Sequence, residues 1–269
     1  MKDKTILITG STDGIGKQTA LELAEMGATV LLHGRNSERA DRVLNEIKKA
    51  TGNDSIEAFI ADLSSLKQIR KLAEQVLYKH DRLDVLINNA GVYETSHRIS
   101  QDGFEMTFAV NHLAPFLLTL LLLELITKSS PGRIINVSSQ VHASGIDFDN
   151  LQAEKYYSAY EAYSLSKLCN VLFTYELAER LKGTGITVNC LHPGVIGTKL
   201  LKVGWGMGGS PVTQGSKTSV YLATASELST ITGHYFVNKK PVKSSQISYD
   251  AETGKRLWCI SEQLTGTFY

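Results

Sequence analysis

The fold is decided near the start of the chain, by Thr5-Ile6-Leu7-Ile8-Thr9-Gly10-Ser11-Thr12-Asp13-Gly14-Ile15-Gly16. The first four residues predict a short strand of the kind that is buried on both faces of a parallel sheet. The glycine-rich turn that follows leads into a helix expected over 17–26, and a second strand is expected over 29–32. Strand, helix and strand in this order form a βαβ unit, so the sequence predicts an α/β fold.

The glycines of this turn follow the pattern TGxxxGxG, which is wider than the GxGxxG fingerprint of many dinucleotide-binding proteins. Glycine lets the backbone approach a pyrophosphate, and the free N–H groups at the start of a helix attract its negative charge. A plain glycine turn is the alternative, but the strand, turn and helix setting favours a phosphate site. The predicted cofactor contacts in the turn are Gly10, Ser11, Thr12, Gly14, Ile15 and Gly16.

The end of the second strand, His33-Gly34-Arg35-Asn36, bears on the type of cofactor. A free ribose 2′-hydroxyl usually meets an acidic residue at this point, and none lies between the end of the strand and Glu38. Arg35 and Asn36 could instead pair with a 2′-phosphate, and Lys17 would add positive potential beside them. This position therefore predicts NADP(H), although a solvated surface arginine is the ordinary alternative.

The rest of the chain continues the alternation of strands and helices. Helices are expected over 37–50, from Asn111 through 126 and over 216–225, and strands over 56–60, 84–87, 133–137, 187–191 and around Tyr235. The apolar run 116–126 is far shorter than the ~20 residues of a membrane span and is interpreted as a buried helix. We therefore predict a single domain over residues 1–269, with a doubly wound, mostly parallel sheet of about seven strands in the Rossmann order.

Polar and small residues follow several of these strands, at the sheet edge where open α/β folds bind ligands. Asp62 could accept a hydrogen bond from an adenine amino group or begin the next helix, for which Ser65 and Gln68 suit a capping box, and we expect both roles together. The small residues of Asn88-Asn89-Ala90-Gly91 would let the backbone pass close to a flat ligand, unless they form a plain turn. Asn111, just before Pro115, suggests a disturbed helical turn whose backbone groups need other partners.

Tyr163-Ser164-Leu165-Ser166-Lys167 places a phenol and an ammonium group four residues apart in a segment expected to be helical, where they share a face. At roughly 4 Å and an effective dielectric constant of about 20, Coulomb's law favours the phenolate by about 4 kcal/mol, or about three pKa units. Tyr163 is then expected to titrate near neutrality. Tyr235 and Lys239 have the same spacing, but in the strand expected there the two side chains would lie roughly 13 Å apart. Taken alone, the first pair could equally belong to an ordinary helix with an exposed lysine.

Composition narrows the classes of function. The 28 Lys and Arg residues balance 27 Asp and Glu residues, leaving a formal net charge of +1 and no global attraction to nucleic acid or an anionic membrane. Cys169, Cys190 and Cys259 lack metal-ligand spacing, which predicts free thiols, a cytoplasmic protein and no metal site. The first strand begins directly after Lys4, so neither a signal peptide nor an N-terminal membrane anchor is expected.

Several motifs occur together in a characteristic order: TGxxxGIG, Asp62-Leu63, Asn88 to Gly91, Asn111, Val137-Ser138-Ser139 and the Tyr163/Lys167 pair. In these motifs the chain resembles the short-chain dehydrogenases/reductases along almost its whole length. The segments 110–119, 163–170 and 191–198, and the tail from Gly233 to Trp258, are similar to the retinol dehydrogenase-like branch. The resemblance implies an oxidoreductase that interconverts a carbonyl and an alcohol by hydride transfer with NADP(H).

The resemblance also implies roles for individual residues. Ser139 would hydrogen-bond the substrate oxygen, since the preceding strand aligns with the family's so that the second serine faces the site. Tyr163 would transfer the proton, Lys167 would hold the nicotinamide ribose and lower the tyrosine pKa, and Asn111 would anchor a water that relays protons to Lys167. Pro193, Gly194 and Thr198 would close over the nicotinamide carboxamide. The implied cofactor contacts are Asp62, Leu63, Asn89, Ala90, Gly91, Tyr163, Lys167, Pro193, Gly194, Val195 and Thr198.

Two segments bear on the substrate. The insert between Ser139 and Tyr163 carries aromatic residues that either line a pocket or pack as a satellite cluster: Phe148, Tyr156, Tyr157 and Tyr160. The stretch 204–211 reads as a mobile lid with Trp205 and Met207 as apolar contact points, or as an ordinary loop. We expect a lipophilic small-molecule substrate. An NADP-binding sensor or scaffold without turnover, and a reductase of a ring carbon–carbon double bond, remain open, and a homo-oligomer is possible.

Overall fold

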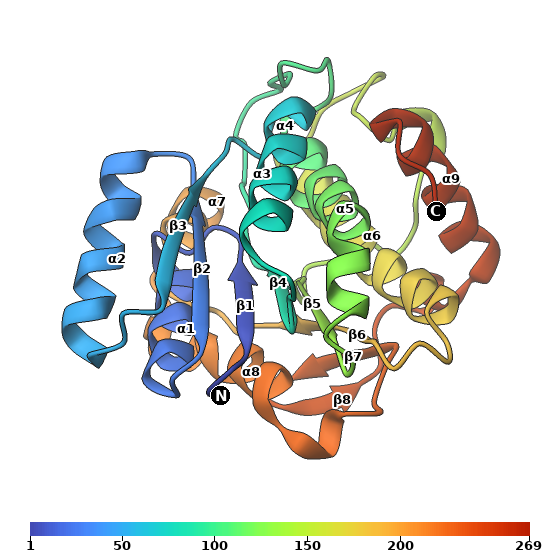
Figure 1. Cartoon of the computed structure of the whole chain (residues 1–269). Coiled ribbons are helices and arrows are strands. Elements are labelled where there is room, and N and C mark those ends of the chain that lie inside the picture. The colour runs from blue at the N-terminus through green and yellow to red at the C-terminus, as the bar shows by residue number, and fades with distance from the viewer.

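A computed structural model describes all residues, 1–269, and contains one eight-stranded sheet in the order β3-β2-β1-β4-β5-β6-β7-β8 (Figure 1). The strands from β3 across to β7 are parallel. The predicted doubly wound sheet is thus confirmed, and the order of the strands reverses between β1 and β4. The strand bounds are β1 Thr5–Ile8, β2 Thr29–Gly34, β3 Ile56–Ile60, β4 Val85–Asn88, β5 Arg133–Val137, β6 Thr187–His192, β7 His234–Val237 and β8 Lys240–Val242.

The eighth strand was not expected from the sequence. β8 pairs antiparallel with β7 and is exposed along its whole length. The chain reverses at Asn238 and Lys239, which both have positive φ angles, of 49° and 65°. Such a turn suits a two-residue hairpin, so the chain adds a short edge strand beside the seven parallel ones.

Helices cover both faces of the sheet. The α-helices are α1 Gly14–Glu25, α2 Ser37–Thr51, α3 Leu66–Lys79, α4 Met106–Phe108, α5 Ala114–Thr127, α6 Ala159–Arg180, α7 Lys199–Trp205, α8 Val212–Thr224 and α9 Ala251–Thr265. Single turns of 3₁₀ helix lie at Phe148–Asn150, Ser226–Leu228 and Gln246–Tyr249, and a π-helical turn spans Ala109–Leu113.

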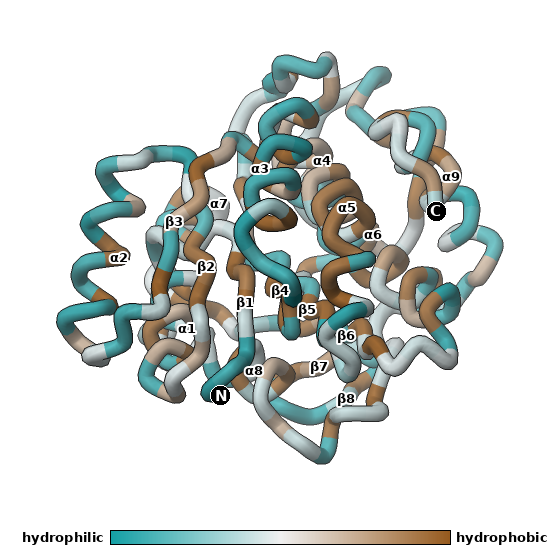
Figure 2. The backbone as a smooth tube through the Cα atoms, viewed as in Figure 1, coloured by the Kyte–Doolittle hydropathy of each residue, from teal (hydrophilic) through white to brown (hydrophobic).

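Two hydrophobic cores lie on opposite faces of the sheet, because successive side chains of a strand point to opposite sides. In β1, Leu7 belongs to the core formed with α3, α5 and α6, whereas Ile6 and Ile8 belong to the core formed with α1, α2 and α8. Figure 2 shows the consequence for the helices: α5 is hydrophobic along most of its length, while the exposed α2 is largely hydrophilic. The strands are therefore buried on both faces, as the apolar run at residues 6–8 predicts.

The buried helix expected from Asn111 through 126 is longer than the sequence indicated. α4, the π-helical turn and α5 form one continuous run, Met106–Thr127, of 22 residues. Its length and composition would allow it to cross a membrane. However, 83% of its apolar 18-residue stretch is buried inside the protein, as in the core helix of a globular domain.

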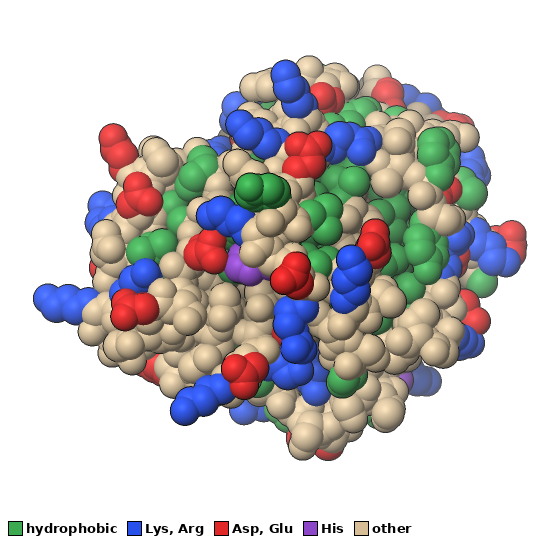
Figure 3. Space-filling view, viewed as in Figure 1, with side chains coloured by type: hydrophobic (Ala, Val, Ile, Leu, Met, Phe, Trp, Pro, Cys, Tyr) green, Lys and Arg blue, Asp and Glu red, His purple; other side chains and the backbone are tan.

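On the face drawn in Figure 3, acidic and basic side chains are interspersed around an apolar area over the middle of the molecule.

The capping box expected at the start of α3 is not formed. Ser65 occupies the N-cap position, but its side chain makes no capping hydrogen bond. Gln68 turns back instead to accept a hydrogen bond from the Asp62 N–H at 2.9 Å, and the Leu66 N–H donates to the Asp102 carboxylate at 2.7 Å. The sequence pattern predicted the start of α3 correctly, but the carboxylate that caps it comes from Asp102, which is distant in the sequence.

Candidate active site

A crevice of about 1390 Å³ runs along the carboxyl edge of the sheet. It crosses the point between β1 and β4 where the strand order reverses, which is where open α/β sheets bind ligands. The structure brings nearly all of the predicted site residues to its walls: Gly10, Thr12, Gly14, Ile15, Gly16, Arg35, Asn36, Asp62, Leu63, Asn89, Ala90, Gly91, Ser139, Tyr163, Lys167, Pro193, Gly194, Val195 and Thr198. The other two, Ser11 and Asn111, are fully buried behind the wall.

The glycine-rich turn requires glycine at specific positions. Gly10 has a φ of +63°, and a Cβ there would lie 2.9 Å from the Cα of Ala90. A Cβ at Gly16 would collide with the Asn89 side-chain amide and the Gly10 carbonyl. The turn therefore lies close against the loop after β4, and α1 begins beside the crevice with the Asp13 carboxylate accepting from its first N–H, that of Gly14, at 2.9 Å. Its backbone can approach a pyrophosphate there.

Ser11, predicted as a cofactor contact, has a structural role instead. Its hydroxyl donates to the Ile8 carbonyl at 2.8 Å and accepts from the His33 N–H at 2.8 Å. These bonds tie the glycine-rich turn to the ends of β1 and β2. The sequence pattern did not distinguish a residue that faces the ligand from one that holds the turn.

His33 joins three strand ends at the base of the crevice. Its Nδ1 accepts from the Gly10 N–H at 3.1 Å, so its proton is on Nε2, which donates to the Ala61 carbonyl at 3.1 Å. Burial lowers the pKa of His33 from 6.5 to about 4. The imidazole is therefore neutral at physiological pH and acts as a structural bridge under the turn.

The low pKa of His33 predicts that stability falls in mild acid. The unfolded chain takes up a proton near pH 6.5 and the folded protein only near pH 4, so stability present above pH 6.5 is lost as the pH falls toward 4. From about pH 7.5 to about pH 5.5 this one residue should cost about 1.4 kcal/mol. Urea unfolding at both pH values should show a smaller fall in His33→Asn than in the wild type. Equal falls in the two proteins would contradict the assignment.

Arginine side chains line the crevice beside α2. Arg35, directly after β2, is one of them, and α2 adds Arg39 and Arg42, which the sequence interpretation missed. Arg39 and Arg42 could have been predicted from the sequence, because they are three residues apart near the start of α2 and therefore lie on the same face of that helix. Asn36 is the N-cap of α2 and accepts from the Arg39 N–H at 2.8 Å, which leaves its NH₂ group free to donate.

The expected contribution of Lys17 must be corrected. Its ammonium group forms an ion pair with Glu46 on α2, so its charge is largely balanced. For Asp62 the expected role at the start of the next helix is confirmed, because its carboxylate accepts from the Ser64 N–H and hydroxyl at 2.9 and 2.8 Å. The carboxylate begins the turn before α3, while the residue still lines the crevice.

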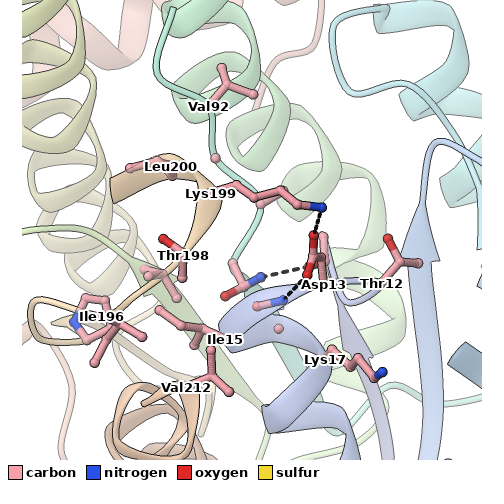
Figure 4. A pocket seen from close by; sticks show the side chains of 18 of the residues that line it. Thr12, Asp13, Ile15, Lys17, Val92, Ile196, Thr198, Lys199, Leu200 and Val212 are labelled. Atoms are coloured by element: carbon pink, nitrogen blue, oxygen red, sulfur yellow. Dashed lines mark hydrogen bonds and ion pairs between the residues drawn. The ribbon is translucent and has the colours of Figure 1, made fainter. Parts of the chain in front are cut away.

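An ion pair crosses the mouth of the crevice. Lys199, the first residue of α7, lies 2.6 Å from the Asp13 carboxylate in the glycine-rich turn, as Figure 4 shows. The hydrogen bond from Lys199 lowers the pKa of Asp13. Both side chains are more than half exposed, so the pair contributes little to stability, but it balances an acidic charge that would face a phosphate.

Asn111 lies in the π-helical turn, where the expected disturbance is confirmed. The Ala114 N–H bonds to the Ala109 carbonyl, five residues back, instead of four. The Asn111 side chain accepts from the Val92 N–H at 2.8 Å and donates to the Val92 carbonyl and the Ser166 hydroxyl at 3.0 Å each. It therefore fixes the loop after β4 against α6.

Ser139 follows β5 with its hydroxyl beside Tyr163. Its Oγ accepts from the Val141 N–H at 3.0 Å, which leaves the hydroxyl proton free to donate to another oxygen. The Ser138 hydroxyl donates to the Lys167 carbonyl at 2.7 Å, inside the fold. Both serines line the crevice, but only Ser139 has a hydroxyl proton that is not already donated, which agrees with the choice of Ser139 over Ser138.

Tyr163 and Lys167 share the buried face of α6, but the expected titration near neutrality is wrong for this structure. Burial raises the pKa of Tyr163 to about 12, with the Ser139 hydroxyl acting in the opposite direction. Burial lowers the pKa of Lys167 to about 8. The Lys167 Nζ lies 5.5 Å from the centre of the Tyr163 ring and donates to the Val137 carbonyl at 3.1 Å. Loss of hydration disfavours both charged forms and outweighs their mutual attraction.

Two further aromatic rings contact Tyr163. The ring centre of Trp205, the last residue of α7, lies 5.5 Å from that of Tyr163, and the two ring planes meet at 79°. The ring centre of Tyr93 lies 5.4 Å from that of Tyr163. Trp205 and Tyr93 are 5.2 Å apart and complete a three-ring cluster. The contact of Tyr93 was not predicted, because the sequence around it carries no pattern. The segment expected to be a lid is thus partly helical and lies against the tyrosine.

The aromatic residues of the insert do not line the crevice, which settles the alternative left open by the sequence. Phe148 packs under the Arg256 guanidinium, 4.1 Å from its ring centre. The Tyr157 hydroxyl donates to the Glu94 carbonyl at 2.6 Å, and Tyr156 and Tyr160 are more than half exposed. Phe148 and Tyr157 therefore hold the insert to its neighbours. Apolar residues of α7 and of the segments on either side of it, among them Ile196, Leu201 and Met207, line the crevice.

The chemistry of these walls fits a dinucleotide. The crevice is lined by the close-packed glycine turn at the start of α1, by arginines, and by a serine, a tyrosine and a lysine. No group of three or more His, Cys, Asp or Glu side chains is placed to hold a metal ion. Fold and site together define a Rossmann-fold oxidoreductase of alcohols and carbonyls.

The chain belongs to the short-chain dehydrogenase family, whose model matches residues 4–204. Human retinol dehydrogenase 13 is 43% identical over 281 residues, covering 98% of this chain and 85% of that protein. Human polyprenol dehydrogenase is 39% identical, covering 98% of this chain and 86% of that protein. These similarities confirm the retinol dehydrogenase-like branch.

Solved structures agree. An uncharacterised protein from Mycobacterium Paratuberculosis has a TM-score of 0.83 and 32% identity, covering 99% of this chain and 94% of the other. A short chain dehydrogenase from Shigella flexneri 2a, complexed with NADP, has a TM-score of 0.74 and 27% identity, covering 88% of this chain and 97% of the other.

Proposed function

We propose that this protein interconverts a lipophilic carbonyl and its alcohol with NADP(H). The observation that carries the proposal is the convergence of Ser139, Tyr163 and Lys167 at one end of a crevice whose other end holds the glycine-rich turn and Arg35. When bound, the nicotinamide cofactor supplies or accepts the hydride. The residues of the chain hold the substrate oxygen and move the proton.

Proton transfer is assigned to the Tyr163 hydroxyl. Its raised pKa keeps the proton on the phenol at neutral pH, which suits donation to the oxygen of a carbonyl as that oxygen gains negative charge. The free hydroxyl proton of Ser139 can donate to the same oxygen. In the oxidative direction Tyr163 must accept a proton, and a positive charge on the buried Lys167 would make this easier.

Cofactor binding is assigned to the glycine-rich turn, to Arg35 directly after β2 and to the arginines of α2. The start of α1 would lie against a pyrophosphate, and Arg35, with no ion-pair partner in the structure, can pair with a 2′-phosphate. Support also comes from the NADP complex of the Shigella flexneri relative, which has the same fold.

A lipophilic substrate is supported by the wall next to Tyr163. Trp205 contacts the Tyr163 ring and lines the crevice together with Val141, Leu201 and Met207, and apolar walls recover little binding energy from a heavily hydrated substrate. Turnover should therefore favour bulky apolar carbonyls over small polyhydroxy compounds.

Trp205→Ala should raise KM for a bulky apolar substrate by about tenfold, since part of the ~1.5–3 kcal/mol that a fully buried large apolar side chain contributes would be lost. Steady-state kinetics with NADPH would measure the change. Val203→Ala is the matched control, because Val203 lies on the same helix and is 55% exposed. Equal KM values for both variants would contradict the assigned wall.

A panel of aldehydes, ketones and alcohols, followed by NADPH absorbance, tests the proposed function. Cyclic enones in the same panel report reduction of a ring carbon–carbon double bond. Turnover of carbonyls or alcohols is expected. Binding of NADPH without turnover of any member would overturn the proposal in favour of a sensor or scaffold.

We also propose a cytoplasmic setting. Cys169, Cys190 and Cys259 are all free, as expected for a reducing compartment. Recovery of the native protein in the membrane fraction after cell lysis, resistant to high salt, would contradict it.

A further inference from the structure

The backbone carbonyl of Ser139 is held by side chains from outside its own strand. β5 ends at Val137, and Ser138 makes the last backbone bond to β6. The Ser139 carbonyl accepts from the Tyr235 hydroxyl at 3.0 Å and from the His142 Nδ1 at 2.8 Å. Both lone-pair positions of this carbonyl are therefore used by side chains.

The tautomer of His142 is fixed by its second contact. Its Nε2 accepts from the Ser245 N–H at 2.9 Å, so the proton must be on Nδ1, which donates to the Ser139 carbonyl. His142 thus connects Ser139 to the segment between β8 and α9. Tyr235, whose spacing to Lys239 repeats that of Tyr163 and Lys167, makes its contribution from β7 instead.

The peptide after Ser139 is held in the same way. The Gln140 N–H donates to the His192 Nδ1 at 3.1 Å, and the Val141 N–H donates to the Ser139 Oγ at 3.0 Å. Tyr235 is only 3% exposed and Ser139 only 7% exposed, so water offers little replacement for a lost bond. The direction of the Ser139 hydroxyl therefore depends on the orientation of this peptide.

We propose that Tyr235 and His142 are positioning residues that hold the Ser139 hydroxyl toward the substrate oxygen. This inference rests on the proposed function. Neither side chain lines the crevice, so both act through Ser139. A small misplacement of a donor in the site is costly to the rate, because its bond to the developing charge depends on geometry.

Tyr235→Phe keeps the ring and removes only the donor. We expect kcat to fall about tenfold or more, with the Kd for NADPH unchanged. Tyr175→Phe is the matched control, because it removes the hydroxyl of a half-buried tyrosine, which bonds to Ser244 at 2.7 Å in the C-terminal part of the chain. The kcat of this control should stay within about twofold of the wild-type value, although its Tm should change by about as much as that of Tyr235→Phe.

Two substitutions separate the contacts of His142. In His142→Asn the amide nitrogen takes the place of Nδ1 and can still donate to Ser139, whereas in His142→Gln the amide takes the place of Nε2 and reaches only toward Ser245. We expect the asparagine variant to keep most of kcat and the glutamine variant to lose it. If His142→Gln kept most of kcat and His142→Asn lost it, turnover would depend on the contact with Ser245 and not on the contact with Ser139. That result would overturn the inference.

Amide exchange gives a readout that needs no turnover. The Val141 N–H is protected by Ser139 Oγ, so its hydrogen exchange, followed by NMR in the free protein, should accelerate at least about tenfold in Tyr235→Phe and not in Tyr175→Phe. Accelerated exchange in a protein that turns over no carbonyl or alcohol would support the positioning and refute the proposed function. Unchanged exchange and unchanged kcat in Tyr235→Phe would refute the positioning.

Discussion

Tyr163→Phe should lower kcat by about 10²–10⁴-fold, the range over which a positioned acid or base contributes to a rate. The ring stays in contact with Trp205 and Tyr93, so the packing of the site is kept and only the proton-carrying oxygen is lost. The affinity for NADPH should change little, because the glycine-rich turn and Arg35 are untouched. Single-turnover rates and fluorescence titration with NADPH would measure the two effects separately.

Tyr160→Phe is the control for this substitution. Tyr160 lies nearly one turn earlier on α6 and is 53% exposed, so removal of its hydroxyl should leave kcat near the wild-type value. If Tyr163→Phe turned over its best substrate at the wild-type rate, the assignment of Tyr163 as the proton donor would be wrong. Lys167→Ala should damage both turnover and cofactor binding.

Arg35→Asp should reverse the preference between the two cofactors. The guanidinium can pair with a 2′-phosphate through two parallel hydrogen bonds, and the free NH₂ group of Asn36 can donate beside it. A hydrogen bond to a charged group contributes about 1.5–3 kcal/mol, so the wild type should favour NADPH over NADH by about tenfold to several hundredfold. An aspartate there would repel the phosphate and accept from a free 2′-hydroxyl.

Dissociation constants for NADPH and NADH, measured in the wild type and in Arg35→Asp, test this expectation. Lys71→Asp makes the same change of charge on the exposed side of α3, away from the crevice, and should keep the wild-type ratio at moderate salt. Equal affinities in the wild type, or a continued preference for NADPH in Arg35→Asp, would remove the argument for NADP(H).

Local patterns were enough to predict most of the fold. The apolar run at residues 6–8, the glycines of the turn and the alternation of strands and helices each depend on nearby residues, and the structure confirms them. The disturbed turn at Asn111 was also predictable, because proline at 115 removes a backbone donor at a known place. The hairpin to β8 was missed because its turn residues, Asn238 and Lys239, are not glycines.

The parts of the site that the sequence did not predict depend on contacts between distant segments. Tyr93 and Trp205 meet at Tyr163 only because the loop after β4 and α7 lie over the same strand ends. The error over the pKa of Tyr163 has the same origin, since burial is a property of the assembled fold and no spacing of two residues reveals it.

The π-helical turn has a consequence for how one helical segment serves two surfaces. An α-helix advances about 100° per residue, so the extra residue at Ala109–Leu113 rotates everything before it by that amount relative to α5. Asn111 can thus reach Val92 and Ser166, while Leu117 and Leu118 keep the buried orientation that the core requires. The extra residue in the turn therefore sets the orientation of Asn111 independently of the orientation of Leu117 and Leu118. Deletion of a single residue here would preserve either the Asn111 contacts or the core contacts of α5, but not both.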